Sequence, residues 1–260
     1  MIRWLLNSFT TWVLAFIVVG GFALLAGVSQ RAVHRFLPKL VVTPDNDLPS
    51  RLISVLMGMF GLMLAFVVVS QYQDLKESEL NVRAEANHLE QLHVDTQVFD
   101  EEMTDRMEVL IGHYLHSLVE REWDLMRDGR SSAQASDDLS DIDTQMQSYE
   151  PKGATQSVYY GNAVGELDAI RDLRRSRLEE AGEELPLELQ LVIMCGALLL
   201  VFFLGCFGSD RAWSHTLMVM AVSALAGFNL LLLITLDHPF SGEISVSNHV
   251  FMQGELSELF

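Results

Sequence analysis

Charged residues are missing from four long stretches of this 260-residue sequence. Each stretch holds about 20 residues or more, enough for a helix to cross a hydrocarbon core of about 30 Å at 1.5 Å per residue. The absence of charge therefore excludes an ordinary soluble protein and predicts four membrane-spanning helices. The four uncharged stretches lie between Arg3 and Arg31, Arg51 and Asp74, Glu188 and Asp210, and Arg211 and Asp237.

Cysteine is also scarce, and its two occurrences, Cys195 and Cys206, both fall in the third uncharged stretch. They are about three helical turns apart, so a disulfide within that helix is excluded. The sequence contains no paired-cysteine zinc pattern, no phosphate-binding loop and no nucleophile elbow. We therefore expect no enzyme activity and no cofactor.

Basic residues are few, 17 against 35 acidic ones, which gives a formal net charge of −18. The imbalance is concentrated in residues 71–186, which hold 27 of the acidic and 11 of the basic residues. Such a segment repels nucleic acid and anionic lipid and attracts cations. We expect no nucleic-acid partner, and a local field that favours inorganic cations.

The predicted fold class is an all-α membrane protein with four transmembrane helices, two before and two after a helical soluble domain. The expected spans are residues 11–28, 52–70, 187–207 and 214–236. The predicted divisions are 1–71, the first transmembrane pair with a proline-rich connector; 72–186, the acidic soluble domain; 187–236, the second transmembrane pair; and 237–260, a C-terminal tail.

Within the soluble domain, residues 72–127 contain no proline and carry apolar residues near the helical period. This pattern predicts two helices, or one bent helix, with a joint near Phe99 and Asp100. Residues 128–139 are expected to form a polar loop, followed by a short helix that ends before Pro151 and a further helix over 154–181. The acidic segment 137–143 lacks the glycine and terminal glutamate of an EF-hand, so we expect a solvated loop there.

Four spans place both termini and the acidic block on one side of the membrane. Near the spans, that side carries seven basic residues and the other side five, which favours a cytoplasmic location for the termini and the soluble domain. The N-terminal segment is similar to a signal peptide, but its uncharged stretch is long for a removable one, and we expect an uncleaved first span.

Histidine and glutamate recur at spacings that metal sites also use. Glu85-x-x-His88 and Glu90-x-x-His93 are consecutive on one predicted helix, whereas a ferritin-like site takes such pairs from two facing helices. We therefore expect a solvated face and no metal. The same expectation applies to His113, His116 and Glu120.

Two further polar features have a structural interpretation. Asn229 lies deep in the fourth span, where a polar side chain bonds a neighbouring helix more often than it lines a path. Arg171, Arg174, Arg175 and Arg177 form the basic cluster of the acidic block, and we expect salt bridges to the acidic helices.

Several stretches together resemble one family, the bacterial bestrophin-like membrane domain. They are Glu-Ala-Asn from Glu85 to Asn87, the arginines of 171–177 ahead of Pro186, and Leu-Asp-His-Pro-Phe-Ser-Gly over 236–242. The resemblance covers residues 54–246 in the same two-span, soluble, two-span order. His238 stands where the family has arginine. The family-motif positions are Glu85, Asn87, Arg171, Arg175, Asp237, Pro239 and Gly242.

The resemblance implies kinship with bestrophins, which are pentameric ion channels whose second span lines the pore. It leads to the hypothesis of an oligomeric channel in the bacterial cytoplasmic membrane, with the lipid bilayer, further copies of the chain and inorganic ions as partners. The alternative is a non-conducting scaffold or sensor whose helical domain binds a cytoplasmic partner; a transporter usually needs more spans. Met57, Phe60 or Leu64 is a candidate hydrophobic constriction. The full set of pore-lining candidates is Ser54, Met57, Gly58, Phe60, Gly61, Leu64, Ala65 and Ser70.

Overall fold

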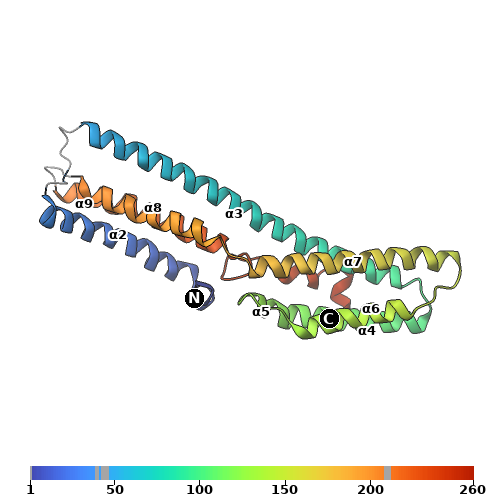
Figure 1. Cartoon of the computed structure of the whole chain (residues 1–260). Coiled ribbons are helices and arrows are strands. Elements are labelled where there is room, and N and C mark those ends of the chain that lie inside the picture. Colours follow the sequence, from blue (N-terminus) through green and yellow to red (C-terminus); the bar gives the residue numbers. More distant parts are fainter. Residues whose placement is uncertain (1, 39–40, 42–46, 208–211) are drawn as a thin grey trace. The chain divides into compact units, whose positions relative to one another are not determined.

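The computed structural model of the chain describes residues 2–38, 41, 47–207 and 212–260. The described part is helical and contains no β-strand, and Figure 1 shows long helices joined by short connections. The α-helices are α1 (Ile2–Ser8), α2 (Thr11–Phe36), α3 (Asp47–Thr96), α4 (Glu101–Ser117), α5 (Trp123–Met126), α6 (Ala133–Ser148), α7 (Gly153–Gly182), α8 (Leu187–Cys206) and α9 (Ala212–Leu236). A π-helix, η2 (Leu118–Glu122), joins α4 to α5, and two 3₁₀ helices, η3 (Asn248–Met252) and η4 (Gly254–Leu259), lie in the tail.

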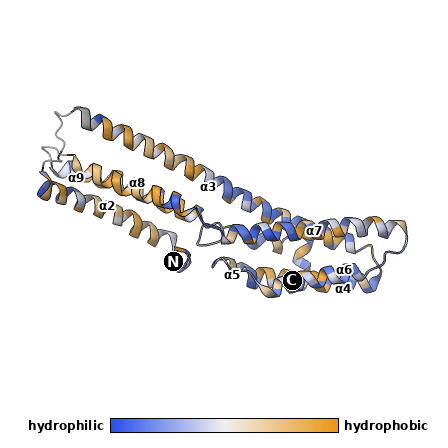
Figure 2. Cartoon of the chain, in the orientation of Figure 1, coloured by the Kyte–Doolittle hydropathy of each residue, from blue (hydrophilic) through white to orange (hydrophobic). Residues whose placement is uncertain are grey.

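The chain divides into two compact units. The membrane unit comprises Met1–Gln73 and Glu184–Asp237, and the soluble unit comprises Asp74–Glu183 and His238–Phe260. Apolar residues are concentrated in α2, α8, α9 and the first half of α3 (Figure 2). In the described residues four helical segments are long and apolar enough to cross a membrane. The predicted all-α membrane fold with four spans is thereby confirmed.

Helix α3 belongs to both units, because its 50 residues contain the second span and the first soluble helix. At 1.5 Å per residue it is about 75 Å long. No proline or glycine interrupts residues 62–96, so the backbone hydrogen-bond ladder continues past the apolar segment. α3 ends at Thr96, and Asp100 caps α4 by accepting a hydrogen bond from the Met103 amide at 3.3 Å. The predicted joint near Phe99 and Asp100 is therefore confirmed.

Close helix contacts in the membrane unit occur at small residues, as expected where helices pack in lipid. α2 packs along α8 and α9. A Cβ atom at Gly227 would lie 3.0 Å from Cβ of Phe22, and one at Gly205 would lie 3.0 Å from the Ser29 hydroxyl. Asn229 donates to the Leu225 carbonyl of its own helix at 2.9 Å. Among the described residues of the single chain, Asn229 is thus bonded within α9 and not to a neighbouring helix.

In the soluble unit, apolar faces of four helices and the tail enclose one core. Each of these elements contributes large buried side chains. They are Val82, Leu89 and Leu92 of α3, Met107, Ile111 and Leu115 of α4, Ile142 and Met146 of α6, Leu167 and Ile170 of α7, and Phe251 of the tail. The tail is held by side-chain bonds as well, since Glu90 accepts from the Glu255 amide at 3.0 Å. Gly254 has a φ of +60°, and a Cβ there would lie 2.5 Å from Glu90 Oε1. The tail is therefore part of the soluble unit.

The polar loop expected over residues 128–139, and the solvated loop expected over 137–143, are corrected by the structure. Helix α6 begins at Ala133, where Ser132 caps it by accepting from the Ala135 amide at 3.3 Å. Buried apolar residues recur along it at intervals of four, three and four, the spacing of the buried face of an amphipathic helix. These buried positions are Ala135, Leu139, Ile142 and Met146.

Candidate functional site

The pore-lining candidates of α3 divide into two groups in the structure. Ser54, Gly58, Gly61 and Ala65 are exposed, and at 100° per residue they share one narrow stripe of the helix. Their small side chains leave the α3 backbone accessible along this stripe. Ser70 is also exposed but lies about 160° around the helix from Ser54, so it is not part of the stripe.

Met57, Phe60 and Leu64 instead contact other helices of the same chain. Leu64 is buried in a cluster with Ile193 of α8 and Leu230 of α9, and Phe60 packs against that cluster. Met57 packs against a second cluster that includes Val201. These three large side chains hold α3 against its own chain and leave the small-residue stripe on the exposed side.

A buried charge cluster lies in the soluble unit. Arg177 of α7 is fully buried and donates to both carboxylate oxygens of Glu85 of α3, at 2.7 and 2.8 Å. It also donates to Glu122 of η2 at 3.1 Å. Arg174, one turn earlier on α7, donates to both oxygens of Glu122, at 3.0 and 2.5 Å. Two guanidinium groups thus neutralise two carboxylates in the interior.

The local sequence explains how these side chains reach the interior. Arg174 and Arg177 continue the buried face of α7 that also carries Leu167 and Ile170. Glu122 ends the π-helix, whose wider turn shifts the residues after it around the helix axis. Glu122 also accepts a hydrogen bond from the Ser132 amide at 3.3 Å, next to the start of α6.

Burial and pairing set the ionisation of the cluster. Burial by itself would lower the pKa of Arg177, but the facing carboxylate of Glu85 outweighs it, and the pKa lies above its ordinary value. The hydroxyl of Tyr114 donates to Glu85 at 3.2 Å. Burial, and then the negative charge of Glu85, raise the pKa of Tyr114 well above its ordinary value. Both groups therefore keep their neutral-pH protonation states.

The C-terminal motif contacts the same region through aromatic rings. Trp123 lies beneath the Arg177 guanidinium, 5.3 Å from ring centroid to Cζ, within cation–π range. Phe240 and Phe251 meet Trp123 edge to face, at centroid distances of 5.9 and 6.0 Å. Ser241 donates to the Arg127 carbonyl at 2.7 Å. The tail motif thus covers the aromatic residue that supports the buried arginine.

The structure places the remaining family-motif residues in several surroundings. Asn87 is exposed and Arg175 pairs with Asp172 at 3.8 Å. Asp237 accepts from the Leu185 amide at 2.9 Å in the membrane unit. In the soluble unit the Pro239 carbonyl accepts from Val246 at 2.8 Å, and Gly242 has a φ of +79°.

The expected pairing of the arginine cluster with acidic side chains is confirmed, but the sequence did not distinguish its members. Arg174 and Arg177 carry the buried bonds, whereas Arg171 and Arg175 lie nearer the surface. The two groups differ in their position on the helix: Arg174 and Arg177 continue the line of buried apolar residues of α7, whereas Arg171 and Arg175 lie to one side of it. Tyr114 belongs to the apolar residues that recur at the helical period in 72–127, whereas Glu122 carries no signal in the sequence.

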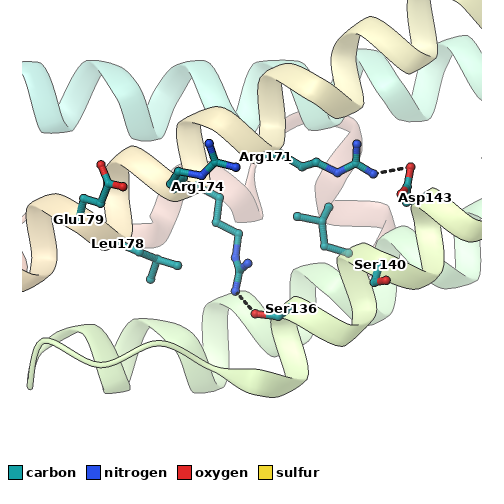
Figure 3. A pocket seen from close by; sticks show the side chains of 9 residues that line it. Ser136, Ser140, Asp143, Arg171, Arg174, Leu178 and Glu179 are labelled. Carbon is teal, nitrogen blue, oxygen red and sulfur yellow. Dashed lines mark hydrogen bonds and ion pairs between the residues drawn. The ribbon is translucent and has the colours of Figure 1, made fainter.

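The outer face of this region contains a pocket of about 480 Å³ between α6 and α7 (Figure 3). Arg174 reaches Ser136 at 2.9 Å, and Arg171 pairs with Asp143 and, at 3.0 Å, with Asp168. Carboxylates already engage Arg171 and Arg174, and the lining of the pocket has mixed charge.

Several of the histidine and glutamate side chains with metal-like spacing bond to other residues of the protein, whereas Nδ1 of His93 is buried without a partner among the described residues. Glu85 pairs with Arg177, and His88 Nδ1 contacts Glu166 at 2.5 Å. His116 contacts Glu120 at 3.0 Å. Among the residues that the structure describes, no three His, Cys, Asp or Glu side chains are grouped as a metal site.

These features define an integral membrane protein with four apolar helices and a helical soluble unit built on an extension of the second span. Residues 20–251 match the model of the Bestrophin-like domain, and the chain belongs to that family. No curated protein matches the sequence significantly.

Solved structures share the fold at low sequence identity. A bacterial bestrophin homologue from Klebsiella pneumoniae carrying one substitution is 15% identical, with a TM-score of 0.62 and 96% of each chain covered. The same homologue solved by zinc phasing is 14% identical, with a TM-score of 0.60 and 93% of each chain covered. A structure described as a membrane protein is 13% identical, with a TM-score of 0.63 and coverage of 94% of this chain and 95% of the other.

Proposed function

We propose that this protein is an oligomeric ion channel whose path is lined by α3. The observation that carries the proposal is the exposed stripe of Ser54, Gly58, Gly61 and Ala65 on the second membrane span. Met57, Phe60 and Leu64 of the same span pack inside the chain, so the stripe lies on the part of α3 that its own chain leaves exposed, next to the exposed large apolar residues of that helix, such as Phe66. Several copies arranged around an axis, as a pentamer for example, would turn these stripes toward a common path.

Small residues suit a path because they leave room for a hydrated ion, while backbone and hydroxyl groups of α3 remain within reach. Continuity of α3 supports the proposal further, since the helix carrying the stripe runs to Thr96 and contains Glu85 of the buried charge cluster.

Cation preference is the expected selectivity. Residues 71–186 carry 16 more acidic than basic residues, and a field of that sign raises the local concentration of cations. The positive residues near the spans favour a cytoplasmic location of this unit. A cation leaving or approaching the membrane from that side would pass through a negative potential.

The test is ion flux through the purified protein in liposomes, with the particle mass measured in parallel. We expect a discrete assembly of several copies, about five, that passes K⁺ or Na⁺ faster than Cl⁻. Liposomes prepared identically without protein are the control for leakage. A homogeneous monomer or dimer that passes none of these ions would contradict the proposal and direct attention to a non-conducting scaffold or sensor.

A further inference from the structure

A second pocket, of about 810 Å³, lies in the membrane unit where α2 ends and α9 begins. It is distinct from the small-residue stripe, because no residue of α3 lines it in the described part of the chain. Its described lining residues are Gln30, Arg31, His34, Arg35, Trp213, His215 and Thr216.

The lining is basic, in contrast to the mixed pocket of Figure 3. Arg31 and Arg35 supply two permanent positive charges, and none of the described lining side chains is a carboxylate. Arg31 donates to the Gly27 carbonyl of its own helix at 3.2 Å. In the described part of the chain neither arginine has an ion pair, so both positive charges are available to a ligand.

One lining residue of the pocket, Gln30, has a buried polar atom that lacks a partner among the described residues. Gln30 is 5% exposed, and its amide contacts Nδ1 of His215 at 2.7 Å. Its side-chain Oε1 is buried with no hydrogen-bond partner among the described residues. A buried acceptor of this kind is normally satisfied by water or by a ligand. A ligand hydroxyl would meet that need after a rotation of the Gln30 side chain that brings Oε1 to the pocket wall.

The surroundings favour a lipid over a soluble anion. α2 and α9 are both membrane-spanning, and their ends at this pocket carry the strongly exposed aromatic residues Phe36 and Trp213. Aromatic side chains concentrate at the level of the headgroups. Exposed Val28 and Leu217 continue along the same helices toward the membrane interior, where acyl chains would lie.

We propose that this pocket binds the headgroup of an anionic phospholipid that also carries a hydroxyl, such as phosphatidylglycerol. The phosphodiester would pair with Arg31 and Arg35, and a headgroup hydroxyl would donate to Oε1 of Gln30.

The test uses the full-length, delipidated protein in detergent, titrated with phosphatidylglycerol or with phosphatidylcholine of the same acyl chains. Bound lipid is counted by native mass spectrometry. We expect one saturable phosphatidylglycerol per subunit. The double variant Arg31→Gln/Arg35→Gln should bind it about 30-fold more weakly, because each basic side chain near an anionic lipid contributes about fivefold.

The matched control is Arg51→Gln, which removes a positive charge outside the pocket at the start of the second span; its phosphatidylglycerol affinity should stay close to that of the wild type. Equal binding of the two lipids, or an equal loss in Arg51→Gln, would overturn the proposal. Displacement of the lipid by inorganic phosphate at equal concentration would show a site for small anions instead. If the double variant does not fold, the proposal is still tested on the wild type, by comparing its binding of the two lipids and by the competition with inorganic phosphate.

Discussion

Arg177 and Glu85 form a fully buried ion pair with two hydrogen bonds, although 92 positions separate them in the sequence. The pair joins α7 to the soluble part of α3. The second membrane span is an earlier part of the same helix. Removing either partner leaves a charge in the interior without its main counter-ion.

Replacing Arg177 by methionine should therefore destabilise the soluble unit strongly. Breaking a buried pair by removing one partner typically costs about 3–5 kcal/mol, because the remaining charge is left buried. Here Glu85 would lose both of its bonds to Arg177. Thermal unfolding of the detergent-solubilised protein, followed by circular dichroism, measures the effect.

The matched control is Arg175→Met, two positions earlier on the same helix. Arg175 is 70% exposed and its contact with Asp172 is long, at 3.8 Å, so this change should leave the unfolding temperature almost unaltered. Equal effects of the two substitutions would show that the buried cluster contributes little to stability.

A second prediction concerns the packing of α3 on α8. A Cβ atom at Gly196 would lie 2.2 Å from Cε2 of Phe60, a separation that real atoms do not adopt. Gly196→Ala should displace the Phe60 ring and destabilise the protein by about 1–3 kcal/mol. Phe60→Leu combined with Gly196→Ala should recover part of the loss, since the shorter side chain leaves room for the methyl group.

Gly21→Ala is the comparison for this change, because Gly21 also lies in a membrane helix but a Cβ there has no neighbour within 4 Å. Its expected effect is neutral or slightly stabilising. Both variants are compared with the wild type by unfolding temperature. If Gly196→Ala behaves like Gly21→Ala, the close packing of α3 on α8 is not maintained in detergent.

The sequence predicted the membrane fold well, because an uncharged run long enough to cross a bilayer has few other stable environments. It predicted the joint near Phe99 and Asp100 for a similarly local reason, because two segments of helical periodicity meet there. It did not predict that Glu85 meets Arg177, because no local pattern reports a contact over that separation. Residues 137–143 were misjudged because their acidic composition obscured the buried positions Leu139 and Ile142.

A third prediction tests which face of α3 meets water. In a background of Cys195→Ser and Cys206→Ser, the variants Gly61→Cys and Ala65→Cys should react with a membrane-impermeant thiol reagent. The modification should block ion flux in liposomes, because the added group would occupy the path. Rates of modification and the residual flux are measured on the same samples.

Phe66→Cys serves as the control on the same helix. Phe66 is 68% exposed but lies about 100° around α3 from Ala65, on a side that we expect to face lipid. It should react slowly and leave the flux unchanged. Fast reaction and block at Phe66→Cys, with none at Ala65→Cys, would place a different face of α3 on the path.

The last prediction concerns Asp237, which lies just beyond the final span. Burial raises the pKa of Asp237 to about 6, above its ordinary value of 3.8, although the bond from the Leu185 amide at 2.9 Å acts in the opposite direction. The folded protein therefore binds a proton at this carboxyl more readily than the unfolded chain does between about pH 4 and pH 6. The Asp237 contribution to stability should fall as the pH rises through this window.

The expected change is roughly 1 kcal/mol, smaller than the full shift implies, because Asp237 is only partly buried and water screens its charge. Asp237→Asn keeps an oxygen that can accept from Leu185 but cannot ionise. The difference in unfolding temperature between this variant and the wild type should therefore grow in favour of the variant from pH 4 to pH 6 and then level off. A difference that stays constant with pH would show that the carboxyl keeps its ordinary pKa, and that the end of α9 is better hydrated than the packing around Asp237 indicates.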